Sequence, residues 1–169
     1  MSAVVIVGLG SNLAHPRRQL ARAIAAIARL PGTALVRVSR HYVTAPLGAS
    51  MPQPDFVNAA IAARTTLCPR ALLRFLLAIE RRQLRRRTPE TPRNAPRTLD
   101  LDLLLYGRRR LHVAQLTIPH PRMHERAFTL RPLRDIAPAA TIPGRGLARR
   151  FLPAVAQQRI ARTRAYPLR

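Results

Sequence analysis

Residues 96–106 read PRTLDLDLLLY, and the alternation within this run predicts a strand. Successive side chains of a strand point to opposite faces, so Asp100 and Asp102 share one face and the intervening leucines share the other. Two carboxylates at the start of a strand can hold Mg²⁺, which prefers oxygen ligands. These residues alone leave an alternative open, in which an exposed strand carries two aspartates that only pair with nearby arginines.

The segment before this strand is rich in arginine. Seven arginines lie within the seventeen residues 81–97, and the proline- and arginine-rich stretch 83–96 predicts a long loop. Carboxylates, divalent cations and guanidinium groups are typical of phosphate-transfer sites, where the metal bridges phosphate oxygens and arginines neutralise negative charge. The combination therefore indicates a site that handles phosphate groups.

Composition limits the class of protein. The 30 basic residues are all arginines and face only 7 acids, giving a formal net charge of +23; the absence of lysine excludes a P-loop. The single cysteine, Cys68, excludes a disulfide framework. A hydrophobic content of 47% suits one core, so we expect a single domain over 1–169. The apolar run 3–9 is too short to span a bilayer, and we expect a cytoplasmic protein with no membrane segment.

The rest of the chain alternates between predicted strands and helices. Strands are expected at 3–7, 33–44, 56–64 and 99–106, and a turn at 8–12. Helices are expected to start at Pro16 and Pro69, and short helical pieces to follow residue 106. We expect Val36, Val38 and Tyr42 on one strand face, and a buried helical stripe of Leu72, Phe75, Leu76 and Ile79. Because strands and helices mix without a regular βαβ repeat, the pattern favours an α+β fold.

A possible ring-binding site lies in the predicted strand at 56–64. Alternation places Phe56 and Asn58 on the same side, an aromatic face beside an amide. A flat heterocycle fits such a pair, because it can stack and also bond in its plane. Phe128 could supply a second aromatic face. The commoner alternative is a core phenylalanine and an asparagine at the end of a strand.

Five segments, in this order and spacing, resemble one enzyme family. They are GSNL at 10–13, TAPLG at 44–48, DFVNAA at 55–60, PRTLDLD at 96–102 and IPHPRMHERAF at 118–128. Each is weak by itself, but together they are specific, and they extend from near the start of the chain to about Pro138. By this resemblance the chain is identified as a member of the 6-hydroxymethyl-7,8-dihydropterin pyrophosphokinases of folate biosynthesis. The resemblance favours the functional interpretation of both aspartates and of the Phe56 and Asn58 pair.

The resemblance implies a ferredoxin-like α+β fold, with an antiparallel sheet flanked by helices in α/β/α layers. It implies an ATP-dependent diphosphotransferase that moves the β,γ-diphosphate of ATP to the hydroxymethyl oxygen of the pterin and releases AMP. Two Mg²⁺ would be held by Asp100 and Asp102, with Asp102 also helping to accept the hydroxyl proton; Arg85 and Arg97 would join them as catalytic residues. The implied pterin site comprises Thr44, Leu47, Phe56, Asn58 and Phe128. The implied ATP contacts are Glu80, Arg85, Arg87, Arg97, Thr117, His120 and Arg126.

The chain departs from the family pattern in two places. Asn94 stands two positions before Pro96, where many members carry an aromatic residue. The loop at 83–96 carries more arginines than catalysis requires, so the spacing leaves open which of Arg85, Arg86 and Arg87 contacts phosphate. The residues from about 145 to 169 form a basic C-terminal extension for which the resemblance implies no catalytic part. We expect a monomer whose partners are ATP and the pterin.

A nucleic-acid-binding module on a ferredoxin-like sheet is the rival hypothesis. This hypothesis explains the positive net charge at least as well as the enzyme hypothesis does, because arginines can follow a phosphate backbone. It does not explain the aspartate pair, since carboxylates repel phosphates unless a metal intervenes. We therefore expect no specific nucleic-acid partner. An inactive scaffold is a third hypothesis, and the presence of Asn58, Arg97, Asp100 and Asp102 argues against it.

Overall fold

The structure, a computed structural model, describes residues 1–48, 51–85, 92 and 94–163. Its helices are α1 (Pro16–Ala28), α2 (Pro69–Arg82) and α3 (Ala127–Ile136), with short 3-10 helices at Met123–Glu125, Ala148–Phe151 and Pro153–Val155. Its strands are β1 (Ala3–Ser11), β2 (Thr33–Val38), β3 (Tyr42–Thr44), β4 (Phe56–Thr65), β5 (Asp100–Tyr106), β6 (Leu111–Val113), β7 (Leu116–Ile118), β8 (Thr141–Ile142), β9 (Gly146–Leu147) and β10 (Ile160–Arg162).

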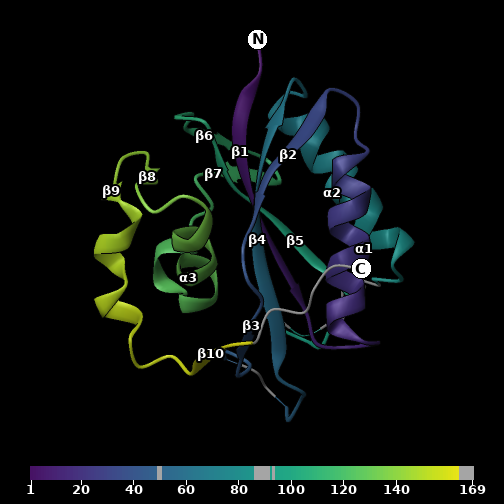
Figure 1. Ribbon diagram of the computed structural model, residues 1–169, viewed down its shortest axis with the longest axis vertical. Helices are drawn as coiled ribbons and strands as arrows, with labels where there is room; N and C mark the ends of the chain where they lie inside the picture. Colours follow the sequence, from purple (N-terminus) through teal and green to yellow (C-terminus); the bar gives the residue numbers. More distant parts are fainter. Residues whose placement is uncertain (49–50, 86–91, 93, 164–169) are drawn as a thin grey trace.

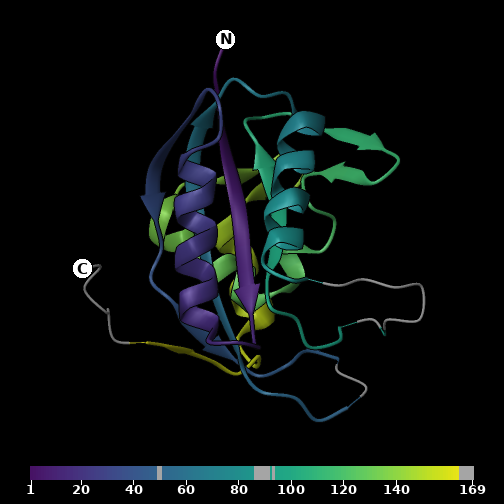
Figure 2. The same ribbon diagram turned by 90° about the vertical axis from the view of Figure 1, so that its right-hand side faces the viewer.

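A six-stranded antiparallel sheet forms the middle layer of the molecule. Strands β10, β3, β4, β1 and β5 are neighbours in that order, and β2 also pairs with β4. Helices α1 and α2 lie side by side on one face and α3 covers the other (Figures 1 and 2). This arrangement confirms the predicted α+β fold with α/β/α layers.

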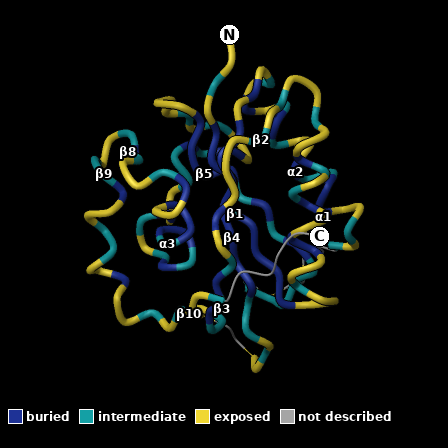
Figure 3. Tube along the Cα trace, in the orientation of Figure 1, coloured by how far each residue is buried: buried dark blue, intermediate teal, exposed yellow. Residues whose placement is uncertain are grey.

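Each face of the sheet has its own hydrophobic core. The core under α1 and α2 includes Leu20, Ile61 and Leu72, and the core under α3 includes Leu104 and Leu130. Buried residues accordingly concentrate in the central strands and on the inner sides of the helices (Figure 3). Within the described part of the chain, no helix combines the length and apolarity that a membrane span requires.

Both predicted helix starts are confirmed. Pro16 and Pro69 occupy the first turns of α1 and α2, where proline removes only an N–H that has no intrahelical partner. Of the stripe expected on α2, Phe75 is the exception: it is 36% exposed, whereas Leu72, Leu76 and Ile79 are buried.

Two predicted boundaries and one predicted strand face were wrong. Residues 8–11 continue β1 instead of forming a turn, because Gly8 and Gly10 pair on both sides, with β4 and with β5. The single strand expected at 33–44 is two strands, because the Ser39 side chain interrupts it by accepting the Ala60 N–H at 2.9 Å. Val36 and Val38, expected to share a face with buried Tyr42, are 52% and 38% exposed.

The C-terminal part of the described chain packs against the sheet and α3. Ile142, Ala148 and Val155 belong to the core under α3. Further along, β10 joins the sheet by pairing with β3, with Ile160 opposite Thr44. Much of the expected basic extension therefore forms part of the folded domain. The last part of that extension, residues 164–169, lies outside the described residues.

Candidate functional site

A pocket opens on the α3 side of the sheet, at the ends of β1, β4 and β5. It is lined by residues from these strands, from the segments 44–47 and 94–97, and from the start of α3. The pocket brings together most of the residues expected at the site: Thr44, Leu47, Phe56, Asn58, Arg97, Asp100, Asp102, Arg126 and Phe128. Residues up to 84 positions apart in the sequence thus share one cavity.

Two glycines of β1 form part of the pocket wall. Gly10 pairs with Asn58 on one side and Asp100 on the other, and Gly8 pairs with Asp102. A Cβ added to Gly10 would lie 3.0 Å from the Asn58 side-chain oxygen. The missing side chains therefore leave space between the amide of β4 and the carboxylates of β5. This role was not predicted from the sequence, although glycine at every second position of a strand indicates it.

The two aspartates of β5 have different surroundings. Asp100 accepts hydrogen bonds from two guanidiniums, that of Arg97 at 2.6 Å and that of Arg85. Asp102 forms no hydrogen bond or ion pair with any other described residue. Burial, and after it the charge of Asp100, raises the pKa of Asp102 to about 7. The pocket thus contains a carboxylate for which the described residues provide no hydrogen-bonding or ion-pair partner.

Arg85 and Glu80 support β5 from behind the pocket. The Glu80 carboxylate is buried, and it accepts hydrogen bonds from Arg85 at 2.5 Å and from the Leu101 backbone N–H at 2.7 Å. Arg85 also donates to the Leu99 carbonyl at 3.0 Å. Neither Glu80 nor Arg85 lines the pocket. The structure therefore joins both residues, expected at the ATP site, to the strand that carries the aspartates.

The part of the pocket away from the aspartates is lined by the aromatic rings of Phe56 and Phe128 and by the amide of Asn58. Asn58 is buried and donates a hydrogen bond to the Thr44 hydroxyl at 2.8 Å. The Arg97 guanidinium carbon lies 5.7 Å from the centre of the Phe56 ring, and that of Arg126 lies 5.4 Å from the Phe128 ring. Each aromatic ring is therefore next to an arginine that also lines the pocket.

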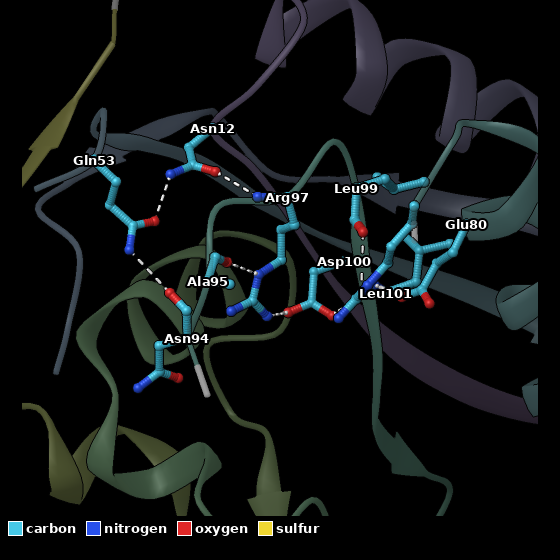
Figure 4. A network of polar contacts seen from close by, with 10 residues as sticks. Asn12, Gln53, Glu80, Asn94, Ala95, Arg97, Leu99, Asp100 and Leu101 are labelled. Carbon is cyan, nitrogen blue, oxygen red and sulfur yellow. Dashed lines mark hydrogen bonds and ion pairs between the residues drawn. The ribbon is translucent and has the colours of Figure 1, made fainter. Parts of the chain in front are cut away.

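Asn12 connects three segments around the pocket. Its side chain donates to the Gln53 side chain at 2.8 Å and to the Pro54 carbonyl at 3.0 Å, and it accepts from the Arg97 N–H at 2.8 Å. Gln53 in turn donates to the Asn94 carbonyl at 2.9 Å (Figure 4). Asn12, 3% exposed, thus holds Arg97 and the segment before Phe56 in place. Asn12 belongs to the GSNL motif at 10–13, which by itself did not predict this role.

Of the remaining expected ATP contacts, the described residues His120 and Thr117 lie outside the pocket lining. His120 follows β7, and burial together with the Arg126 charge lowers its pKa to about 4. Its Nδ1 accepts the Arg122 N–H at 3.3 Å, which leaves Nε2 as the protonated nitrogen of a neutral ring. Thr117, on β7, contacts His112 at 3.1 Å. Arg87 lies outside the described residues, as does Arg86.

The residues present are compatible with Mg²⁺. The described part of the chain contains no group of three or more acidic, histidine or cysteine residues that could enclose a metal. Mg²⁺ does not need such a group, because it commonly binds one or two carboxylates together with substrate phosphates and water. Asp100 and Asp102 both face the pocket and supply those carboxylates.

An α/β/α sandwich with carboxylates, arginines and aromatic rings in one pocket is typical of enzymes that transfer phosphate groups. A model of the family described as 7,8-dihydro-6-hydroxymethylpterin-pyrophosphokinase (HPPK) matches residues 6–138. The chain belongs to this family and is therefore a pyrophosphokinase of folate biosynthesis, as the sequence motifs indicated.

Relatives at high identity agree with this assignment. Three are named 2-amino-4-hydroxy-6-hydroxymethyldihydropteridine pyrophosphokinase. The protein of Pseudomonas aeruginosa is 50% identical over 139 residues, covering 82% of this chain and 83% of the relative. That of Haemophilus influenzae is 45% identical, covering 81% and 83%. That of Synechocystis is 44% identical, covering 83% and 70%.

Solved structures show the same fold. An HPPK-DHPS chain in complex with substrates superposes with a TM-score of 0.68 at 13% identity, covering 91% of this chain. Wild-type HPPK-DHPS of Plasmodium falciparum also gives 0.68, at 12% identity and 93% coverage. The present chain spans 43% and 45% of those longer chains, so the likeness concerns their HPPK-type domain fold alone.

Proposed function

We propose that this enzyme transfers the β,γ-diphosphate of ATP to the hydroxymethyl oxygen of 6-hydroxymethyl-7,8-dihydropterin. In this reaction the hydroxyl oxygen bonds to the β-phosphorus, the bond from that phosphorus to the α,β-bridging oxygen breaks, and AMP leaves while the hydroxyl proton is lost. The observation that carries the proposal is the pocket itself, in which an aromatic, amide-lined end adjoins a pair of aspartates.

The pterin ring is assigned to the aromatic end. Phe56 and Phe128 line the same pocket from opposite elements, β4 and the start of α3, so a flat ring can stack between them. Asn58 supplies donor and acceptor atoms in the plane of such a ring, and its hydrogen bond to Thr44 sets the orientation of its amide. Leu47 adds apolar contact at the same end.

The diphosphate is assigned to the end that carries Asp100 and Asp102. These carboxylates would hold two Mg²⁺, and Mg²⁺, when bound, neutralises phosphate charge and aligns the transferring group. Arg97 already contacts Asp100 and lines the pocket, so it can turn to phosphate oxygens without leaving the site. Arg126 and the neutral His120 add donors on the α3 side. As a metal ligand, Asp102 would also help to accept the hydroxyl proton.

Two other residues act through neighbours. Glu80 and Arg85 bond to the start of β5, which carries both aspartates, through the Leu101 N–H, the Leu99 carbonyl and the Asp100 carboxylate. In the ATP complex Arg85 would also contact phosphate, as would Arg87. We propose that the whole chain, 1–169, is one such domain, monomeric and cytoplasmic.

Product analysis tests this function directly. The protein is mixed with ATP, Mg²⁺ and 6-hydroxymethyl-7,8-dihydropterin, and the products are identified by mass spectrometry. We expect AMP and the pterin diphosphate in equal amounts. A pterin monophosphate with ADP, or no product from folded protein, would contradict the proposal.

Nucleic-acid binding is the second candidate function, and the net charge of +23 favours it. Salt titration of binding to random-sequence DNA distinguishes the two. A binding module should associate tightly, with an affinity that falls steeply as salt rises. For the pyrophosphokinase we expect only weak association that is lost near physiological salt.

A further inference from the structure

The residues 158–162, called here the C-terminal clamp, contact three separate elements that carry pocket residues. Gln158 bonds to the start of α3, Arg159 pairs with Asp55 just before β4, and β10 pairs with β3. The family model ends at residue 138, twenty positions before the clamp begins. The clamp therefore lies outside the segment whose motifs identify the family.

Gln158 caps the first turn of α3 from a distance in sequence. Its Oε1 accepts the Ala127 N–H at 2.8 Å, and its Nε2 donates to the Glu125 carbonyl at 2.7 Å. The residue at the N-cap position, Arg126, makes no side-chain cap. The first N–H groups of a helix have no intrahelical partner, and Ala127 is only 1% exposed, so Gln158 supplies a bond that water could not easily replace.

The turn that Gln158 caps is the one that faces the pocket. Arg126 and Phe128, on either side of Ala127, both line the cavity. A change in the direction of this first turn would move the Phe128 ring relative to Phe56 on the opposite wall. The position of one wall of the ring site thus depends on a residue that does not itself line the pocket.

The other two contacts hold the opposite wall. Arg159 donates to both oxygens of Asp55, at 2.7 and 2.9 Å, and Asp55 directly precedes Phe56. Ile160 pairs with Thr44, whose hydroxyl accepts the hydrogen bond from Asn58. The clamp therefore joins the element that carries Phe128 to the elements that carry Phe56 and Thr44.

We infer that the C-terminal clamp sets the width of the ring-binding end of the pocket, with Gln158 as its principal positioning residue. The inference rests on the proposed assignment of the pterin to this end. Asp100, Arg97 and the Asn12 contacts are formed without any clamp residue, so the clamp governs the pterin more than the phosphates.

The test compares Gln158→Ala with Gln157→Ala, a matched control at an exposed neighbour. Steady-state kinetics give KM for each substrate, calorimetry gives the affinity for the pterin in the presence of a non-hydrolysable ATP analogue, and thermal unfolding gives stability. In Gln158→Ala we expect KM and Kd for the pterin to rise about tenfold, with KM for ATP changed less than about twofold. Gln157→Ala should match wild type.

A third variant separates positioning from folding. Gln158→Glu keeps an oxygen that accepts the Ala127 N–H but loses the donor to Glu125, so its pterin KM should lie between those of wild type and Gln158→Ala. It also keeps the proposal testable if Gln158→Ala does not fold. Equal pterin KM in all variants, or a lower melting temperature with both KM values unchanged, would overturn the inference.

Amide hydrogen exchange provides a readout that needs no substrate. Without ligand, residues 127–130 should exchange faster in Gln158→Ala than in Gln157→Ala, because the first turn of α3 has lost its cap. If amide exchange at residues 127–130 is unchanged, the inference about the C-terminal clamp is overturned, while the proposed function is unaffected. If instead wild-type protein neither binds nor converts the pterin, the proposed function fails, and the exchange data still decide whether the clamp orders α3.

Discussion

The two faces of β1, β4 and β5 are built from alternate residues of the same three strands, yet they differ in size and polarity. The face under α1 and α2 is built mainly from buried apolar side chains along these strands, among them Val5, Val7, Leu9, Ala59, Ile61, Ala63, Leu101 and Leu103. At the pocket, the opposite face carries Gly8, Gly10, Asn58, Ala60, Asp100 and Asp102. Neighbouring residues of one strand can therefore differ completely in their contribution to stability and to chemistry.

This difference has a physical basis. Burial of apolar area stabilises a fold, and it needs close packing with large side chains. A site for a ring and a diphosphate needs space and polar atoms, which weaken packing. Period-two alternation lets one sheet meet both requirements, because the well-packed face holds the strands in place while the other face lines the pocket. Substitutions at adjacent positions can test this separation.

The largest effect is expected from Asp102→Ala. This carboxylate faces the pocket and has no partner among the described residues, so its loss should remove a metal ligand and lower kcat about a thousandfold or more. The free energy of unfolding should be unchanged or slightly higher, because a buried carboxylate is removed. Steady-state kinetics and urea unfolding of the same preparation provide the check. Activity close to wild type would refute the metal assignment.

The adjacent substitution, Leu101→Ala, should show the opposite behaviour. Leu101 is 4% exposed in the core under α1 and α2, so truncation should cost about 2–5 kcal/mol of unfolding free energy. Under conditions where the variant is folded, kcat should remain near that of wild type. Urea unfolding and kinetics at low temperature measure both quantities. A large loss of kcat in fully folded Leu101→Ala would mean that the two faces are not functionally separate.

A smaller effect is expected where a side chain is added to the pocket wall. In Gly10→Ala the new Cβ would lie 3.0 Å from the Asn58 oxygen, so the Asn58 side chain must shift by a few tenths of an ångström, which misaligns the amide that faces the ring site. We expect KM for the pterin to rise about tenfold, since one well-oriented hydrogen bond is lost, while KM for ATP stays the same. If KM rises for ATP and not for the pterin, the assignment of the two ends is reversed.

The last expected effect is on stability and not on catalysis, and it concerns pH and His120. Its folded-state pKa of about 4 lies below the ordinary value of 6.5, so the unfolded chain binds more protons between these values. Stability should therefore fall as pH drops from about 7 towards 4, by at most about 3 kcal/mol from this residue. His120→Asn should flatten this dependence in urea unfolding measured across the range. Burial also lowers the pKa of His41, but His41 is present in both proteins and cancels in the difference. If the unfolding free energies of wild type and His120→Asn change with pH in parallel, the lowered pKa of His120 is contradicted.

The sequence predicted the parts of the site that depend on alternation within one strand. Phe56 with Asn58, and Asp100 with Asp102, face the same pocket because a strand has a period of two. It did not predict that 8–11 is a strand, since glycines favour turns unless neighbours on both sides pair with them, as β4 and β5 do here.

Contacts between distant segments could not be predicted at all. Asn12 reaches Gln53 across 41 positions, and Gln158 reaches Ala127 across 31. Such polar bonds have no periodic signature, because any exposed amide could form them. Likewise, the interruption between β2 and β3 depends on a hydrogen bond from Ala60 to the Ser39 hydroxyl. These features depend on how distant segments pack together in the folded protein, and no local sequence pattern indicates them.

The central claim is that the α3 side of the sheet binds ring, diphosphate and metal in one pocket. The most direct test is a crystal structure with Mn²⁺ in place of Mg²⁺, a non-hydrolysable ATP analogue and the pterin, with metals located by anomalous scattering. We predict two peaks between the carboxylates of Asp100 and Asp102 and the phosphates, with the ring between Phe56 and Phe128. Metal and nucleotide bound anywhere else on the protein, with these aspartates unoccupied, would contradict it.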